Sequence, residues 1–245
     1  MEIDIHSFDS SFLLEEFRKV DISLSENQIN QFILFYNALV EKNKVMSLTA
    51  ITEWKDIVVK HFLDSALIVK TVCLEEFSNL IDVGTGAGFP GIVLKILYPD
   101  LEITLADSLN KRLNFLNEVI EMLSLKGIRT VHARAEELGR DPAYREKYQI
   151  AVSRAVASLP TLCEYCMPLV KIGGVFVSYK SDKAEDEIQS SKKAIKVLGG
   201  MMEKSKMIPL PGDDITRCFV VIRKDSATGK KYPRKAPLPS KDPIV

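Results

Sequence analysis

The spacing of hydrophobic residues divides the chain into two regions. Hydrophobic residues recur at helical spacing between Phe12 and Val20, after the capping candidate Ser25, and again between Ile57 and Val69. No stretch before residue 79 needs a strand. The pattern therefore predicts a helical region over residues 1–78.

From residue 79 onward, short hydrophobic runs alternate with longer helical segments, which predicts a doubly wound, mostly parallel sheet of the α/β class over residues 79–224. Two of the later runs, at 202–210 and 216–224, follow one another without a helix and predict an antiparallel hairpin at the sheet edge. Residues 159–174 and 183–200 are each expected to form one helix. The runs expected as strands are LIDVG, EITLADS, IRTVHARA, QIAVSRA, GVFVSYK, MEKSKMIPL and TRCFVVIRK.

Composition excludes several classes of protein. No hydrophobic run approaches the roughly 18 to 20 residues of a membrane span, and the chain starts with acidic rather than basic residues, so a cytoplasmic location without a signal peptide is expected. Four cysteines without a regular framework and three histidines predict neither a disulfide scaffold nor a metal site. Cys163 and Cys166 lie in a helix-like stretch and are expected to be buried thiols rather than nucleophiles.

Charge is balanced in total but not along the chain. The 33 basic and 33 acidic residues cancel, whereas residues 1–79 are acidic and residues 223–245 carry seven basic residues against two acidic ones. The segment 225–245 is therefore expected to be a basic tail, without regular structure from Gly229 to Pro243. Such a tail suits either local contact with nucleic acid or simple solubility.

The strongest local signal is LIDVGTGAGFPG at 80–91, a buried strand that enters a glycine-rich turn and a helix. Glycines let the backbone approach a ligand closely, and Gly84 and Gly86 lie in this turn. Residues 86–91 also match GxGxxG, so a dinucleotide site is an alternative. Asp82 favours a cationic ligand such as a sulfonium, because its carboxylate would repel a pyrophosphate.

Polar residues follow the next two strands. Asp107 lies where a carboxylate can accept hydrogen bonds from both ribose hydroxyls, and Arg134, Ala135 and Glu136 follow the third strand, where they can hold the edge of an adenine. Taken singly, Asp107 or Glu136 could serve only as a helix cap. Their coincidence predicts a crevice for a nucleoside.

These residues resemble a known family, the bacterial 16S ribosomal RNA guanine-N7 methyltransferases, also called glucose-inhibited division protein B. The likeness covers almost the whole chain. It is found in DVGTGAGFPG from Asp82, DSLNKR from Asp107, Ala135-Glu136, SRAV from Ser153, Gly174, and the segments LTAI (48–51), HFLDS (61–65) and KYPRK (231–235).

The resemblance implies a class I methyltransferase fold with an N-terminal helical extension, S-adenosylmethionine as donor, and a guanine of 16S rRNA, guanine 527, as acceptor. It also implies the small ribosomal subunit or its RNA as partner. The cofactor positions that it implies are Gly84, Phe89, Ala135, Glu136 and Arg154. The tail departs from the family pattern at APLP (236–239), where a glycine-containing turn is common.

The implied chemistry agrees with the residues present. Guanine N7 has a free lone pair and no proton, so the reaction needs alignment of two reactants rather than a general base. Arg154 is the expected catalytic or orienting residue, with a role toward the methionine carboxylate, Asp82 or the guanine; a salt bridge that only holds the fourth strand is the alternative. The expected RNA contacts are Lys230, Lys231, Arg234 and Lys235, with Tyr232 as a stacking surface.

Three alternatives stay open at this point. The chain could methylate another RNA or a small molecule, bind nucleotides or RNA without catalysis, or use NAD. Trp54 and His61 are expected to have structural roles, and Lys42, Lys44 and Lys60 could extend a basic surface.

Overall fold

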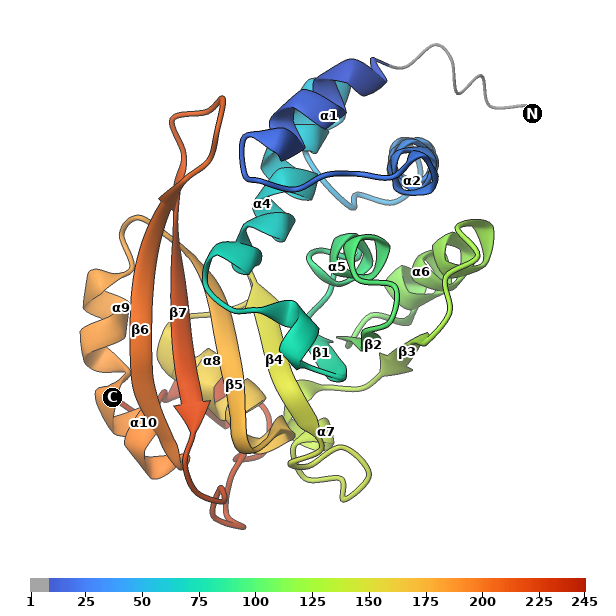
Figure 1. The fold of residues 1–245 in the computed structure, drawn as a ribbon. Helices are drawn as coiled ribbons and strands as arrows, with labels where there is room; N and C mark the ends of the chain where they lie inside the picture. Colours follow the sequence, from blue (N-terminus) through green and yellow to red (C-terminus); the bar gives the residue numbers. More distant parts are fainter. Residues whose placement is uncertain (1–8) are drawn as a thin grey trace.

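The computed structural model describes residues 9–245, and it consists of a helical layer, a central sheet and a second set of helices (Figure 1). The start of the chain, residues 1–8, lies outside the described residues, so the structure does not address the expectation that rests on its acidic charge. In residues 9–78 there is no strand, as predicted. The helices and helical turns of this region are α1 (Ser10–Arg18), α2 (Glu26–Asn43), α3 (Trp54–Ile57), the π-helical segment η2 (Val58–Leu63), α4 (Asp64–Ala66), η3 (Leu67–Lys70) and η4 (Leu74–Glu76).

Local signals start the first two helices. The Asp9 side chain accepts a hydrogen bond from the backbone N–H of Phe12, 3.1 Å away, at the start of α1. Ser25 and Gln28 form a reciprocal capping box at the start of α2, as the Ser25 signal predicted. Buried Phe32 then contacts both Phe17 and Phe62, with ring centroids 5.2 and 4.9 Å apart, so aromatic packing joins three separate helical segments.

The sheet has seven strands in the order β3-β2-β1-β4-β5-β7-β6. Strands β1 to β5 are parallel, and β7 pairs antiparallel with both β5 and β6. This confirms the predicted parallel sheet and its antiparallel edge hairpin. The strands are β1 (Asn79–Val83), β2 (Glu102–Asp107), β3 (Ile128–His132), β4 (Tyr148–Arg154), β5 (Val170–Ser181), β6 (Gly200–Pro209) and β7 (Thr216–Lys224).

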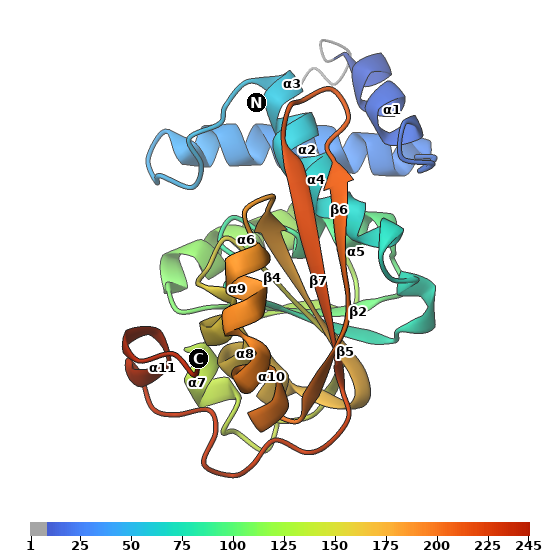
Figure 2. The same ribbon diagram turned by 90° about the vertical axis from the view of Figure 1, so that its left-hand side faces the viewer.

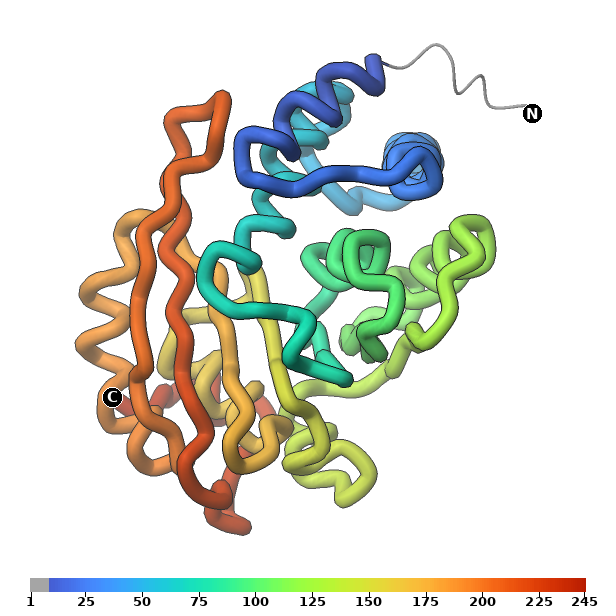
Figure 3. Tube along the Cα trace, viewed as in Figure 1, coloured from blue at the N-terminus to red at the C-terminus, as the bar shows by residue number. Residues whose placement is uncertain are grey.

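Helices cover both faces of the sheet, and each face has its own hydrophobic core (Figure 3). One core includes residues of the N-terminal helical layer, α5 and α6, and the other includes residues of α8, α9 and α10. The helices of this part of the chain are α5 (Gly91–Leu97), α6 (Asn110–Met122), α7 (Ala135–Leu138), α8 (Leu159–Cys166), the turn η5 (Met167–Leu169), α9 (Glu185–Ser190), α10 (Lys192–Val197) and α11 (Leu238–Lys241).

Two predicted helices were wrong in their extent. Helix α8 and the turn η5 end at Leu169, and Val170 already belongs to β5, because this stretch pairs with β4 as a parallel strand. The segment expected as one helix over 183–200 is divided at Ser191, whose hydroxyl donates to the Glu187 carbonyl at 2.5 Å. Side chains that bond their own backbone in this way often bend helices.

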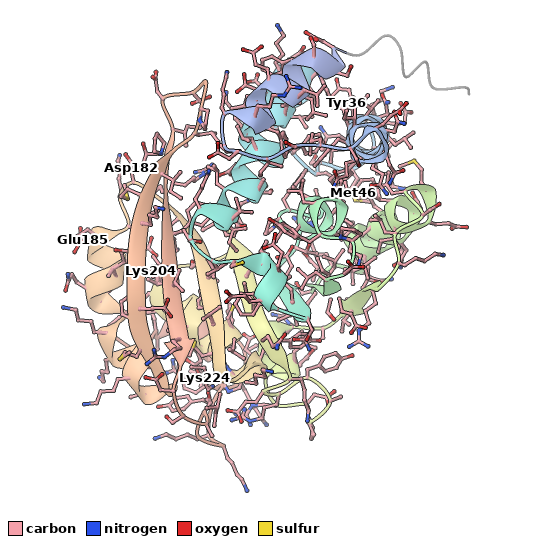
Figure 4. The ribbon with its side chains drawn as sticks, viewed as in Figure 1. Tyr36, Met46, Asp182, Glu185, Lys204 and Lys224 are labelled. Carbon is pink, nitrogen blue, oxygen red and sulfur yellow. The ribbon has the colours of Figure 1, made fainter. Side chains whose placement is uncertain are left out.

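The C-terminal tail was expected to lack regular structure, and this is wrong for one turn of it. Residues 238–241 form α11, which lies beside α8 (Figure 2). The tail begins after Lys224, which is labelled in Figure 4 and is fully buried. Its ammonium group donates to the carbonyl of Met167 at 2.6 Å and to the Thr228 hydroxyl. Among residues 9–245, no helix is long and apolar enough to cross a membrane.

Candidate active site

A cavity of about 540 Å³ opens at the carboxyl ends of β1, β2 and β4. The glycine turn after β1 lines it, and its charged lining residues are Asp107, Arg112, Arg134, Glu136 and Arg154. Segments far from the sheet in sequence complete it: Thr49 comes from the N-terminal region and Ser240 from the tail. The crevice that the sequence predicted therefore exists, and it has walls that the strand pattern did not predict.

At Gly84 the glycine turn has a backbone conformation that only glycine adopts easily. This residue has φ of +75°, and a Cβ placed on it would lie 2.5 Å from a methyl carbon of Val156. Its N–H donates to the carbonyl of Ala106 on the neighbouring strand, 2.8 Å away. Gly84 and Gly86 both line the cavity, so the turn presents backbone to a ligand there.

Asp82 is not in the cavity wall, which corrects the expectation that its carboxylate faces a sulfonium. The side chain is fully buried beneath the turn. Its Oδ2 accepts hydrogen bonds from the Thr85 hydroxyl at 2.7 Å and from the Gly91 N–H at 2.9 Å. Asp82 therefore holds the turn against the start of α5, and its influence on a ligand is indirect. An ion pair with Asp82 was one of the roles considered for Arg154, and the structure pairs Arg154 with Asp64 instead.

The buried position of Asp82 has a measurable consequence for stability. Burial raises the pKa of its carboxyl from 3.8 to about 6, against the lowering effect of its bonds to Thr85 and Gly91. Between pH 3.8 and about 6, the Asp82 carboxyl binds a proton more readily in the folded protein than in the unfolded chain. The stability of the protein therefore falls as pH rises through this range. Between pH 4 and 7, we expect the free energy of unfolding of the wild type to fall by up to about 3 kcal/mol more than that of Asp82→Asn. Denaturant titrations at several pH values test this, and parallel curves for the two proteins would contradict it.

Asp107 lies at the end of β2 and connects the glycine turn to the second strand. It accepts hydrogen bonds from the N–H of Gly86 at 3.0 Å and of Leu109 at 2.9 Å, and it pairs with Arg112 at 3.3 Å. The residue is mostly buried, yet it lines the cavity. Its position is compatible with the predicted ribose contact, which stays a prediction.

Ala135 and Glu136 begin α7 directly after β3 and also line the cavity, as does Arg134. Glu136 is buried. Burial raises the pKa of Tyr165 on α8, and the nearby Glu136 carboxylate acts in the same direction. The predicted adenine contact of Ala135 and Glu136 stays a prediction, and the structure adds Tyr165 to the same wall.

Arg154 ends β4, and its guanidinium lies over the ring of Phe89, with its central carbon 5.1 Å from the ring centre. Its Nη1 donates to Asp64 at 2.8 Å, and its Nη2 lies 3.5 Å from Nδ1 of His61. Both Arg154 and Phe89 line the cavity, as does His61. The structure therefore joins the predicted positions Phe89 and Arg154 to the HFLDS segment, which the sequence alone did not connect to the site.

His61 has a structural role, as expected, but it also forms part of the cavity wall. Its ring stacks on Phe89 with centroids 4.7 Å apart, and its Nε2 lies 2.8 Å from the Thr49 hydroxyl. Burial lowers its pKa to about 4, and the nearby Arg154 guanidinium acts in the same direction. His61 is therefore neutral at physiological pH and adds no positive charge beside Arg154.

The basic residues of the tail differ in their surroundings, and Arg234, one of the expected RNA contacts, already has a carboxylate partner. Its guanidinium forms two parallel bonds to Glu164 of α8, from Nε to Oε1 at 3.0 Å and from Nη2 to Oε2 at 2.7 Å, and Glu164 is fully buried. This geometry makes Arg234 an anchor that fastens the tail to the sheet helices. Lys230, Lys231 and Lys235 are exposed, so these three remain candidates for RNA contact.

The cysteines agree with the sequence expectation. All four are free, and Cys163 and Cys166 are fully buried in the core beneath α8. Burial raises the pKa of both thiols well above its usual value. A buried thiol that stays protonated is a poor nucleophile, in keeping with the expectation that both are core thiols.

Comparison with known proteins decides the family. The family model described as rRNA small subunit methyltransferase G matches residues 28–211. The chain belongs to this family. A relative from Acetivibrio thermocellus, named ribosomal RNA small subunit methyltransferase G, is 51% identical over 233 residues, which cover 95% of this chain and 96% of the relative. A relative of the same name from Lachnoclostridium phytofermentans is 46% identical and covers 97% of this chain and 98% of its own.

Solved structures agree on the fold. The chain is similar to StiE O-MT residues 961–1257, with a TM-score of 0.53 and 14% identity, over 69% of this chain and 75% of that one. It is also similar to the YcgJ protein from Bacillus subtilis, with a TM-score of 0.50 and 12% identity, over 68% of this chain and 100% of that one. The protein has a class I methyltransferase fold, as the resemblance implied.

Proposed function

We propose that the protein transfers a methyl group from S-adenosylmethionine to N7 of a guanine in 16S ribosomal RNA. The observation that carries the proposal is the cavity at the ends of β1, β2 and β4, in a chain that belongs to a family of rRNA methyltransferases. The same position is the usual ligand crevice of open parallel sheets. The names of the relatives support ribosomal RNA of the small subunit as the substrate.

The residues of the cavity fit the proposed donor. Its volume of about 540 Å³ lies within the usual range for small-molecule sites. A carboxylate at Asp107 suits ribose hydroxyls, and the Arg154 guanidinium suits the carboxylate of the methionine moiety. Gly84 and Gly86 let the donor approach the backbone between these two ends.

When bound, the donor supplies an electrophilic methyl group on a sulfonium. The residues of the chain then need only hold two reactants in line, because guanine N7 has no proton to remove. Arg154 orients the donor through its guanidinium, and the turn after β1 fixes the depth to which the donor enters. The neutral His61 ring packs on Phe89 and forms part of the wall at this end of the cavity.

The decisive experiment reads the RNA directly. In a strain that lacks this gene, chemical cleavage at 7-methylguanosine should disappear at one position of 16S rRNA and return when the gene is restored. Purified protein should also transfer a labelled methyl group to small subunits or 16S rRNA. Retention of every modified guanine would refute the substrate, and transfer only to another RNA or to a small molecule would support the alternative stated from the sequence.

The exposed lysines of the tail predict a salt-dependent contribution to RNA affinity. We expect replacement of Lys230, Lys231 and Lys235 with alanine to weaken RNA binding by about tenfold at ~0.1 M salt and to reduce the dependence on salt concentration. Substitution is a cleaner test than truncation, since Arg234 and Glu164 tie the tail to the body of the protein.

A matched control removes the same charge elsewhere. Lys192, Lys193 and Lys196 are exposed on α10, and their alanine variant should keep RNA affinity within about twofold. Equilibrium binding over a series of salt concentrations compares the two triple variants. Equal losses in both would show that net charge alone matters, and no loss in the tail variant would remove the tail from the interface.

A further inference from the structure

Asp64 is a buried carboxylate that holds two guanidinium groups at once. It lies on α4, directly after the π-helical segment, and no part of it reaches solvent. Its Oδ2 accepts from Arg154 Nη1 at 2.8 Å and from Arg217 Nη2 at 3.1 Å, and its Oδ1 accepts from Arg217 Nε at 2.7 Å. Both oxygens are therefore satisfied, and three distant parts of the chain meet at this carboxylate.

The charges of this cluster do not cancel. Two guanidinium groups face one carboxylate, so one positive charge remains. Arg154 lines the cavity, whereas Arg217, at the start of β7, does not. Arg154 is therefore the member of this cluster that can present its guanidinium to a ligand in the cavity.

The geometry also limits how Arg154 can move. A guanidinium has five N–H donors in a fixed plane, and Asp64 engages one end of this fork while the Phe89 ring lies against the group. An unheld arginine side chain has many rotamers, and ordering it on ligand binding weakens affinity. Because Asp64 already holds the Arg154 side chain in the free protein, little rotamer freedom is lost when the ligand binds.

We infer that Asp64, itself held by Arg217, is a positioning residue that orients the Arg154 guanidinium toward the carboxylate of the bound donor. This inference rests on the proposed function, because it requires Arg154 to contact the donor. It assigns a role to the HFLDS segment and to Arg217, which does not touch the cavity.

A purely structural role is the competing explanation, since Asp64 also ties the N-terminal helical layer to β7. Lys60 makes a similar connection with Asp213, at 3.4 Å, before the start of β7. Asp213→Asn is therefore a matched control, because it weakens a link between the same two parts of the protein without touching the Arg154 side chain. Its donor affinity should stay within about twofold of the wild type.

A double-mutant cycle separates the two explanations. The affinity for S-adenosylmethionine is measured by calorimetry for the wild type, Asp64→Asn, Arg154→Ala and the double variant, each at a temperature where it is folded. We expect Asp64→Asn to weaken donor binding by about tenfold when Arg154 is present, and by less than twofold in the Arg154→Ala background. A role in stability alone would lower the melting temperature but leave donor affinity unchanged.

Arg217→Lys provides a second test if Asp64→Asn does not fold. It keeps the positive charge but loses the planar fork that bonds both oxygens of Asp64, and it should weaken donor binding by about threefold only when Arg154 is present. Equal losses with and without Arg154, or unchanged affinity in both variants, would overturn the inference. Absence of methyl transfer to RNA by the wild type would instead refute the proposed function, and the binding cycle would still report on Asp64.

Discussion

Arg154→Ala is expected to lower kcat/KM for methyl transfer by on the order of 100-fold. The guanidinium lines the cavity, lies over Phe89 and is held by Asp64, so it is ordered where a donor would bind. Loss of a charge-assisted hydrogen bond costs about 1.5–3 kcal/mol, which corresponds to roughly 10- to 150-fold in affinity or rate. Single-turnover methylation of 16S rRNA, together with calorimetric donor binding, measures the effect.

The fold should survive this substitution. Arg217 continues to bond both oxygens of Asp64 in the variant, so the buried carboxylate keeps a charged partner. Arg154→Lys is the comparison variant, since it restores the charge without the planar fork and should recover only part of the activity. Unchanged turnover in Arg154→Ala would reduce the residue to an ion pair that holds β4, which was the alternative stated from the sequence.

Gly84→Val is expected to abolish detectable donor binding, a loss of at least about 100-fold. The residue has φ of +75°, which a β-branched residue adopts only under strain, and its Cβ would collide with the Val156 side chain. Val156 is 41% exposed and lines the cavity, so a valine at position 84 that displaces its side chain changes the space for a ligand. Calorimetric titration with S-adenosylmethionine tests the prediction.

A control separates backbone strain from blockage of the cavity. Gly173 also has positive φ, at +84°, but a Cβ there meets nothing within 4 Å and the residue does not line the cavity. Gly173→Val should lose a similar amount of stability through strain and still bind the donor normally. Loss of binding in both variants would point to general destabilisation, and normal binding in Gly84→Val would contradict the placement of the donor beside the turn.

The sequence identified residues of the site more reliably than their roles. Gly84, Asp107 and Glu136 were expected at one crevice because each follows a strand of a parallel sheet, and the structure brings them to the wall of one cavity. Asp82 and Arg234 were assigned to ligands by residue type and position, yet one braces the turn from below and the other anchors the tail. Residue type does not show whether a charged group already has a partner inside the protein.

The cavity-lining residues that come from outside the sheet had a weaker signal in the sequence. Thr49 and His61 occur in segments that marked the family resemblance, but no periodicity connects them to a crevice more than 20 residues further along the chain. Ser240 and Tyr165 had no sequence signal at all. The structure brings all four to the same cavity as the glycine turn.

The amino-acid sequence by itself determined the helical start, the parallel sheet with its edge hairpin, and the crevice at the strand ends, because these follow from periodicity and strand order within short stretches of chain. Only the tertiary structure decided that Arg154 pairs with Asp64 rather than Asp82, and that the tail packs back to add Ser240 to the cavity. Such pairings join residues 70 to 90 positions apart, and they depend on which charged groups become buried together when the helices pack against the sheet.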